Sequence, residues 1–444
     1  MAEIVVVGGG FAGISASIRL AKLGHAVTLL EASDRLGGQL LPYERDGLVW
    51  PAGPQTLTVP ATLRDLFRKS GRPVERVLDL QHVVPGRRHV FGYYDDDVPT
   101  RAPTPRGTVL DLPMGSRADQ QEELDSVLGA GTGAAWNAWL NALAPSWDVL
   151  RRRAIDRAFS GPKDLDRQDR RTLRPRLTLA RAVRRKLSDE RLTAMVIDRG
   201  RLGGQQPRTT PAFVAVADVI ERSFGRWRID GGDAALLSAL VQRLAERRVD
   251  VRLGSPALDV VLADGQVSGV LLDRSVLAAD LVVWAAPAPP PTIGDPITAL
   301  PVLRTARTLL VLGTDAVALP PETVVHHDPP LRIASDHTRA DLRQAWTVEH
   351  SGDEDVLATL AKYGIDVREQ VEARWDLSAV DLARRADGAA HGWQWSGWRT
   401  GVQHPGVGAP RAGLFRVGVN AHPGPSLEQV AMGTATLATG IGKA

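Results

Sequence analysis

The N-terminal segment alternates between apolar runs and a helical pattern. Residues 3–8, EIVVVG, form a Val-rich run that ends in glycines, which is typical of a buried parallel strand. Residues 11–23 place Ile14 and Ile18 at helical spacing and end at Gly24. The run AVTLLE then predicts a second strand. This order predicts a βαβ unit, whose crossover helix makes the two strands parallel.

Regular patterns return in the middle and at the end of the chain. Residues 231–248 repeat leucine every fourth position, at Leu236, Leu240 and Leu244, and predict an amphipathic helix. Apolar strands follow, with Asp264-Gly265 as a hairpin turn between two of them. Near the end, GLFRVGVN predicts a strand and SLEQVAMGTATLATGIG a helix. Three regular α/β pieces are therefore separated by two less regular insertions.

The insertions have weaker patterns. A stretch rich in Pro and Gly runs from about residue 85 to 115, and residues 120–129 and 134–147 predict helices. The segment PAPPP at 287–291 is a plausible linker. For Trp136, Trp139 and Trp147, a place in the core is favoured over a place in a wide aromatic pocket.

Composition narrows the class of protein. A chain of 444 residues that is 43% hydrophobic can bury a sizeable core in two or three domains. It has no apolar run long enough for a membrane span and no signal peptide at its start. We therefore expect a cytoplasmic protein, with peripheral membrane contact left open. The absence of Cys excludes disulfides, thiolate metal sites and a cofactor tethered through a thioether.

The net charge of +3 is unevenly distributed. Basic residues far outnumber acids between residues 151 and 191. A solvated helical face is the favoured explanation, and attraction to anionic lipid or to an acidic partner is the alternative. Nucleic acid is not expected as a partner, because aromatic residues are not interleaved with the basic ones.

The segment GGGFAG carries the clearest chemical signal. Gly8, Gly10 and Gly13 follow the G-x-G-x-x-G pattern between a predicted strand and a predicted helix. These glycines allow a tight turn, close approach of a pyrophosphate and close helix–strand contact, and the helix N-terminus faces the phosphates. Glu31 ends the second strand, where a carboxylate can accept both ribose hydroxyls and repel a 2′-phosphate. The sequence therefore predicts a dinucleotide site for NAD or FAD.

Several motifs resemble one family. EASDRLGGQ resembles the flavoproteins of the amine oxidase and phytoene desaturase superfamily through Glu31, Arg35, Gly37 and Gly38. Further matches to the phytoene desaturase branch follow in DGLVWPAGPQTLTVPATLRDLFRKSG, and lie at Asp46, Gly47, Gly53, Pro54, Leu66, Phe67 and Gly71. The block around Ala257 is similar to the second segment of the family's FAD domain. The closing segment matches at Gly418, His422, Pro423 and Gly424.

The resemblance implies a fold and a cofactor. We expect an α/β fold, with a Rossmann-like FAD-binding domain built from residues 1–75, 228–291 and 405–444. An inserted α+β substrate-binding domain would comprise residues 76–227 and 292–404. Non-covalent FAD would contact Gly8, Gly10, Phe11, Ala12, Gly13, Glu31, Ala32, Arg35, Gly37, Gly38, Gln39, Gly53, Pro54, Ala257, Gly418, Val419, Gln429 and Val430.

The resemblance also implies an activity. Relatives dehydrogenate a substrate by hydride transfer to FAD, and the substrate here would be a hydrophobic or conjugated small molecule. An amine or protoporphyrinogen oxidase is one alternative. A flavoprotein whose FAD is structural, or which isomerises a double bond, is another. The sequence makes no prediction of oligomeric state or of the electron acceptor.

No catalytic residue is assigned by these patterns. His422 is a candidate proton shuttle or packing residue near the flavin. The pair His326-His327 fits a loop between strands better than a metal site. Asp95 to Asp97 fit a solvated loop better than a cation or diphosphate site. No metal site is expected, and neither a G-x-S-x-G elbow nor a P-loop motif occurs.

The segment RLGGQ occurs twice, at residues 35–39 and 201–205. The first copy follows a strand and Glu31, so its glycines are expected to contact FAD. The second follows the probable end of a helix and lacks a preceding strand with a terminal acid. Gly203 and Gly204 are therefore expected to form a turn, which leaves one dinucleotide site.

Overall fold

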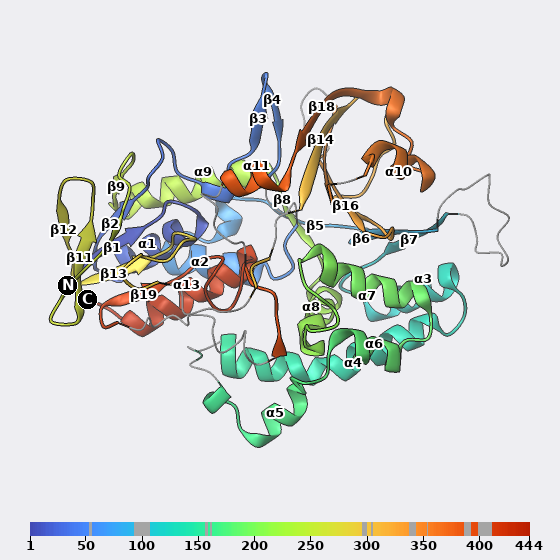
Figure 1. Cartoon of the computed structure of the whole chain (residues 1–444), viewed down its shortest axis with the longest axis horizontal. Coiled ribbons are helices and arrows are strands. Elements are labelled where there is room, and N and C mark those ends of the chain that lie inside the picture. Colours follow the sequence, from blue (N-terminus) through green and yellow to red (C-terminus); the bar gives the residue numbers. More distant parts are fainter. Residues whose placement is uncertain are drawn as a thin grey trace.

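Two large sheets organise the chain and lie next to each other, the five-stranded sheet on the left and the seven-stranded sheet on the right of Figure 1. The computed structural model describes residues 1–52, 56–92, 107–155, 159, 162–294, 300–302, 305–336, 343–352, 354–385, 392–397 and 411–444.

The first sheet is parallel in all its pairings. Its strand order is β19-β13-β1-β2-β9, with β1 (Glu3–Val7), β2 (Ala26–Leu30), β9 (Asp250–Arg252), β13 (Leu281–Trp284) and β19 (Leu414–Arg416). The strands come from three separate parts of the chain. The sheet confirms the predicted α/β fold and the predicted βαβ unit.

Both faces of this sheet are covered. Alternate residues Ile4 and Val6 pack with α1 (Phe11–Lys22), α2 (Ala61–Ser70), α9 (Gly232–Glu246) and α13 (Leu427–Ile441). Val5 and Val7 pack with an antiparallel sheet of β10 (Asp259–Ala263), β11 (Gln266–Leu271) and β12 (Val276–Ala278). Covering on both faces explains why the β1 run is continuously apolar. Asp264 and Gly265 have φ of 52° and 77° and confirm the predicted hairpin turn.

The second sheet has the order β18-β14-β17-β16-β15-β6-β7. Its strands are β6 (Arg87–Phe91), β7 (Thr108–Leu112), β14 (Ala306–Leu312), β15 (Glu322–Val325), β16 (Leu331–Asp336), β17 (Gln344–His350) and β18 (Val371–Leu377). Among the described strands of this second sheet, only the β15–β6 pair is parallel. One face packs on α10 (Val356–Lys362).

A group of helices lies below this sheet in Figure 1. It contains α3 (Arg117–Leu128), α4 (Thr132–Leu150), α5 (Arg167–Leu173), α6 (Leu179–Lys186), α7 (Glu190–Leu202) and α8 (Val216–Phe224). The helices predicted at 120–129 and 134–147 are thereby confirmed. Trp136 and Trp139 are 4% and 2% exposed and belong to the apolar core of this group, and Trp147 packs against it. The core interpretation of these residues is confirmed.

Short elements complete the described chain. Two strand pairs join β3 (Tyr43–Arg45) to β4 (Leu48–Trp50) and β5 (Leu80–His82) to β8 (Trp227–Ile229). The remaining turns of helix are α11 (Ala379–Arg384), η1 (Gly38–Leu40), η2 (Val74–Arg76), η3 (Arg151–Ile155), η4 (Pro162–Asp164), η5 (Ala212–Ala215) and η6 (Arg368–Gln370). Within the described ranges, no helix combines the length and apolarity that a membrane crossing requires.

Candidate functional site

The glycine turn after β1 leaves the N-terminus of α1 bare. Gly8 has a φ of 103°, and Gly10 precedes α1 without a side-chain cap. A Cβ atom on Gly13 would lie 1.8 Å from the carbonyl oxygen of Gly8, so only glycine allows the helix to contact the turn. The first turn of α1, which includes Phe11 and Ala12, carries no acidic residue. Uncapped N–H groups and the helix dipole therefore favour a bound anion at this turn.

Glu31 is fixed beside the turn. Its Oε2 accepts a hydrogen bond of 2.6 Å from the Gly9 N–H, and its Oε1 accepts from the N–H and the hydroxyl of Ser33, both at 2.8 Å. The neighbouring Ala32 is exposed. Each carboxylate oxygen has more than one lone-pair site, so Glu31 keeps acceptor capacity for a ligand hydroxyl.

The first RLGGQ segment packs against the glycine turn through its backbone. The Gly37 N–H donates to the Gly9 carbonyl at 2.9 Å, and Gly37 forms a bridge with Gly10. A Cβ atom on Gly38 would lie 3.1 Å from the Cα of Gly10. Gly37 and Gly38 have φ of 133° and 55°, which glycine adopts most readily.

Five further residues were predicted to contact FAD: Arg35, Gln39, Gly53, Pro54 and Ala257. The Arg35 side chain is 54% exposed and lies 3.9 Å from Glu44, and Gln39 is also exposed. Ala257 lies two residues after Ser255, whose N–H donates to the Glu31 carbonyl at 2.8 Å. Gly53 and Pro54 lie outside the described residues.

The C-terminal motif reaches the start of α1. A Cβ atom on Gly418, whose φ is 113°, would lie 3.5 Å from the Cβ of Ala12, and Val419 follows directly. Val430 on α13 belongs to the same apolar core as Ala12. Gln429 completes a capping box with Ser426 at the start of α13. Three distant parts of the sequence thus meet around one helix N-terminus.

His422 lies where the C-terminal motif contacts the segment after α4. Its Nε2 contacts the carbonyl oxygen of Ala154, and its ring centroid is 5.4 Å from that of Phe159. Burial lowers the pKa of His422, and the contact with the Ala154 carbonyl opposes that effect only partly. A neutral ring that donates Nε2–H to a carbonyl is a packing and anchoring group, which is one of the two predicted roles.

The side chains of the adjacent residues His326 and His327 have different contacts. His326 and His327 follow β15 in a loop, as predicted, but His326 lies 2.9 Å from Asp198 and His327 lies 3.2 Å from the Tyr363 hydroxyl. Across the described residues, no group of three His, Cys, Asp or Glu side chains is placed to hold a metal ion. Asp95 to Asp97 lie outside these residues.

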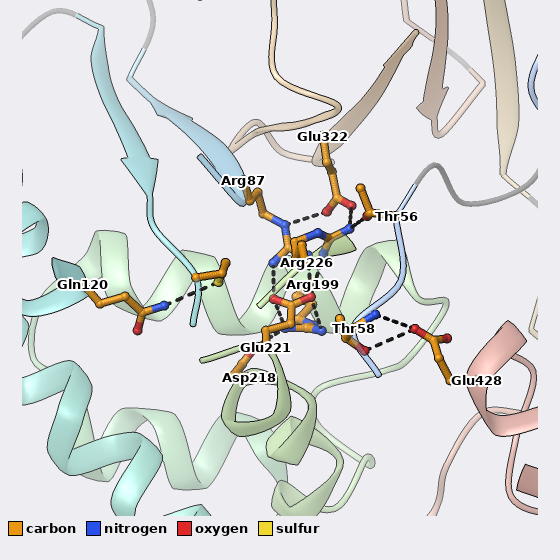
Figure 2. A network of polar contacts seen from close by, with 11 residues as sticks. Thr56, Thr58, Arg87, Gln120, Arg199, Asp218, Glu221, Arg226, Glu322 and Glu428 are labelled. Carbon is orange, nitrogen blue, oxygen red and sulfur yellow. Dashed lines mark hydrogen bonds and ion pairs between the residues drawn. The ribbon is translucent and has the colours of Figure 1, made fainter. Parts of the chain in front are cut away.

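A buried network of ion pairs, drawn in Figure 2, joins the second sheet to the helices. Arg87 on β6 donates to Glu221 on α8 at 3.0 and 3.1 Å and to Glu322 on β15 at 2.5 Å. Glu221 also accepts from Arg199 on α7 at 2.9 Å and from Arg226 at 2.6 Å. Sequence reasoning missed this network, whose members come from two strands, two helices and the residue before β8.

The network extends to the first sheet's helices. Arg226 also contacts Glu322 and the hydroxyl of Thr56. Two residues further, the Thr58 N–H donates to Glu428 on α13 at 2.6 Å. Figure 2 shows Thr56 and Thr58 on one segment between Arg226 and Glu428. The segment from Thr56 to Thr58 thus contacts the network through Thr56 and the start of α13 through Thr58.

Opposite charges keep these buried groups ionised. Burial disfavours the carboxylate of Glu221, but Arg199, Arg87 and Arg226 outweigh burial and lower its pKa to about 2. Burial also acts on Asp218, where it exceeds the effect of Arg199 and raises the pKa. Such networks cost desolvation energy that only good geometry repays, so the network fixes the position of its strands and helices.

The parallel sheet and the glycine turn before α1 define an α/β protein of the Rossmann-like class, accompanied by a mixed seven-stranded sheet and a group of helices. A family model described as "Flavin containing amine oxidoreductase" matches residues 11–308. This match covers more than half of the chain, and the chain belongs to the flavin-containing amine oxidoreductase family.

Curated relatives point to one branch of that family. The 4,4′-diapolycopene oxygenase of Methylomonas sp is 28% identical over 304 residues, which cover 63% of this chain and 55% of that protein. The 4,4′-diapophytoene desaturase of Staphylococcus aureus strain Newman is 24% identical over 265 residues, which cover 59% of this chain and 50% of that protein. The chain spans about half the length of the curated relatives it matches.

Solved structures with the same fold cover the whole chain. An oxidoreductase from Methanosarcina mazei has a TM-score of 0.64 at 16% identity and covers 98% of this chain and 99% of its own. Cyclohexylamine oxidase from Brevibacterium oxydans has a TM-score of 0.64 at 13% identity and covers 99% of both chains. Likeness at this level of identity shows the fold alone.

Proposed function

We propose that the protein binds FAD non-covalently and dehydrogenates a hydrophobic or conjugated small molecule. The observation that carries the proposal is the bare N-terminus of α1, enclosed by Gly8, Gly13 and Gly37 and flanked by the fixed carboxylate of Glu31. The absence of Cys supports a non-covalent cofactor. When bound, FAD supplies a hydride acceptor for an activated C–H bond.

Different residues would bind the pyrophosphate, the ribose and the flavin of FAD. The pyrophosphate would lie at the N–H groups of Gly10 to Gly13, and the adenosine ribose at Glu31. The flavin end would lie toward Gly418 and the start of α13. The predicted contacts of Arg35, Gln39, Gly53, Pro54 and Ala257 are part of the same proposal.

The proposed substrate class is supported by the relatives. The names of both curated relatives refer to diapolycopene or diapophytoene. We propose a lipophilic substrate of comparable character, bound between the first sheet and an insertion made of residues 76–227 and 292–404. The FAD domain would comprise residues 1–75, 228–291 and 405–444.

One experiment separates this function from its alternatives. The purified protein is tested for a flavin spectrum and then titrated anaerobically with polyenes, simple amines and porphyrinogens, and the product masses are measured. Flavin bleaching by polyenes, with a product lighter by two hydrogens, is the expected result. Bleaching by amines alone would favour an amine oxidase, and a product of unchanged mass would favour an isomerase. A colourless protein that takes up no flavin would contradict the proposal.

We also propose that α5, α6 and their connection make peripheral contact with an anionic membrane. Their exposed cations are Arg167, Arg170, Arg171, Arg174, Arg176, Arg181, Arg184, Arg185 and Lys186. Leu179, Ala182 and Val183 are the buried side of α6. Such a surface is attracted to anionic lipid, and salt weakens the attraction.

Vesicle sedimentation tests this contact. The protein should sediment with anionic vesicles at low salt and be released as salt rises. Changing Arg184 and Arg185 to Glu should abolish sedimentation without loss of flavin. Equal sedimentation with neutral and anionic vesicles would show that the basic surface is only solvated.

A further inference from the structure

Three buried side chains form a hydrogen-bonded chain under the second sheet. Asp198 Oδ2 lies 2.9 Å from His326 Nδ1, and His326 Nε2 lies 2.9 Å from His89 Nδ1. Asp198 belongs to α7, His89 to β6, and His326 follows β15. The His326 N–H donates to the Val90 carbonyl at 2.9 Å. The neighbouring parallel strands therefore hold the two imidazoles in register.

Ring packing fixes their orientation as well. The two imidazole rings are nearly coplanar, with 12° between their planes. Phe91 stacks on His326 with ring centroids 4.4 Å apart and 4° between the planes. Rotation of either imidazole would break a hydrogen bond and a stacking contact.

The positions of the hydrogens follow from Asp198. A carboxylate can only accept, so Nδ1 of His326 carries the hydrogen and its Nε2 carries a lone pair. That lone pair takes the hydrogen on Nδ1 of His89. A neutral His89 has one ring hydrogen, so its Nε2 is a bare acceptor.

This acceptor has no partner among the described residues, although His89 is only 2% exposed. Burying an acceptor without a hydrogen-bond partner costs the free energy of removing that atom from water. A buried atom of this kind, oriented by two further groups, points to a ligand that donates a hydrogen bond.

Burial keeps the two imidazoles uncharged. Burial lowers the pKa of His89, and His326, Arg87 and Arg199 add to this effect while Glu322 opposes it. Burial lowers the pKa of His326 too, although Asp198 opposes it. Both imidazoles are therefore uncharged at neutral pH, and a proton that reaches Nε2 of His89 does not stay there as a charge but displaces the hydrogen on Nδ1.

We propose that Asp198, His326 and His89 form a proton relay whose open end, Nε2 of His89, receives the proton that a bound substrate loses from carbon, through one water whose O–H donates to this nitrogen. The proposal rests on the proposed function, because substrate oxidation is the source of this proton. As one carbon of the substrate loses a hydride, a C–H bond on the adjacent carbon breaks, and its electron pair forms the new C=C double bond. The proton passes to the water, and the water gives one of its own protons to Nε2 of His89.

The proton then moves along the chain. It bonds to Nε2 of His89, the Nδ1 hydrogen of His89 passes to Nε2 of His326, and the Nδ1 hydrogen of His326 passes to Oδ2 of Asp198. Asp198 lies 3.5 Å from Arg201, whose side chain is 38% exposed. The relay thus ends on the buried carboxylate of Asp198, beside the partly exposed Arg201.

Nitrogen NMR of histidine-labelled holoenzyme tests the resting state without any turnover. We expect His89 and His326 to carry hydrogen on Nδ1 and a bare nitrogen at Nε2. His89→Asn and His326→Asn assign the signals. Hydrogen on Nε2 of His89 would overturn the proposal.

Kinetics test the transfer. Asn at position 89 keeps an amide donor toward His326 but removes the basic nitrogen. His89→Asn should slow flavin reduction by about a hundredfold or more and abolish its solvent deuterium isotope effect, with unchanged flavin content. Asp198→Asn should slow it less and shift its pH profile.

His327→Asn is the matched control, because His327 is adjacent in sequence but contacts Tyr363 and Glu354 instead. It should behave as the wild type. Flavin reduction by His89→Asn at the wild-type rate would overturn the relay. If no compound reduces the flavin of the wild-type protein, the proposed function fails, and the nitrogen spectra alone decide the relay.

Discussion

The two RLGGQ segments have identical residues and different structures. The first, residues 35–39, pairs its glycine backbone with the turn after β1, through the Gly37–Gly9 hydrogen bond of 2.9 Å. The second, residues 201–205, contains the last residue of α7, Leu202. Its Gly203 has φ of −79° and ψ of 10°, close to helical values, and only Gly204, at φ 71°, is left-handed. The prediction of a chain turn is confirmed.

The difference lies in what surrounds each segment. The first copy contacts another backbone segment, at a place where a Cβ atom cannot fit. The second ends a helix, and its glutamine, Gln205, contacts the segment of Trp393 and Trp395. Shortly before the second copy on α7, Asp198 belongs to the proposed relay, and Arg199 belongs to the ion-pair network. A short motif therefore defines a ligand site only together with the backbone that faces it.

The largest expected effect concerns the network beside the second copy. Glu221→Gln removes one buried acid and leaves Arg87, Arg199 and Arg226 facing fewer negative charges. Breaking such a pair costs about 3–5 kcal/mol of unfolding free energy, while flavin content should stay unchanged. Denaturant unfolding measures the loss. Glu75→Gln, in the exposed pair with Arg64, is the control and should change stability by less than about 1 kcal/mol.

The same variant should change the response to acid. The pKa of Glu221 is about 2 when folded and about 4.3 for an unperturbed glutamate. A lowered pKa gives stability above the unfolded value, which is lost as pH falls from about 4.5 toward 2. The wild-type unfolding free energy should fall in this window, and that of Glu221→Gln should fall less. Parallel pH curves would show that Glu221 is not the group involved.

The next effect tests the first copy. Gly37→Ala adds a Cβ atom at a φ of 133°, 2.7 Å from Leu237 and 2.9 Å from Leu41. Strain of this kind costs about 1–3 kcal/mol, and the segment should move away from the glycine turn. We expect loss of bound flavin, measured by absorbance after gel filtration. Full flavin retention would contradict the assignment of this segment to the cofactor site.

Local signals allowed much of the fold to be predicted. Each signal lies in the element that it predicts. The glycines form the turn before α1, the Val-rich run forms β1, and Asp264-Gly265 form the turn between β10 and β11. The ion-pair network could not be predicted, because Arg87 and Glu221 are 134 positions apart. The charge of a residue does not indicate which residue of opposite charge it will contact. His326 was noticed only for its neighbour His327, yet its partner Asp198 is 128 positions away.

A smaller effect is expected at Gly204. Its φ is 71°, and a Cβ atom would lie 2.2 Å from Cγ1 of Val302. Left-handed backbone costs a residue other than glycine about 1–2 kcal/mol, and the Val302 side chain can shift. Gly204→Ala should therefore lower the unfolding free energy by about that amount and keep full flavin content. Loss of flavin in this variant would assign a ligand role to the second copy.

The smallest effect is expected at Gly203, the counterpart of Gly37 in the second copy. Its near-helical backbone suits alanine, and the nearest atom to an added Cβ, the Gly200 carbonyl oxygen, is 3.4 Å away. Alanine also restricts the unfolded chain, which stabilises by about 0.4–1 kcal/mol where the backbone permits it. Gly203→Ala should therefore leave flavin content unchanged and raise stability slightly in thermal unfolding. Because Gly37→Ala and Gly203→Ala make the same change in the same five-residue sequence, similar flavin loss in both would remove the distinction between the two copies.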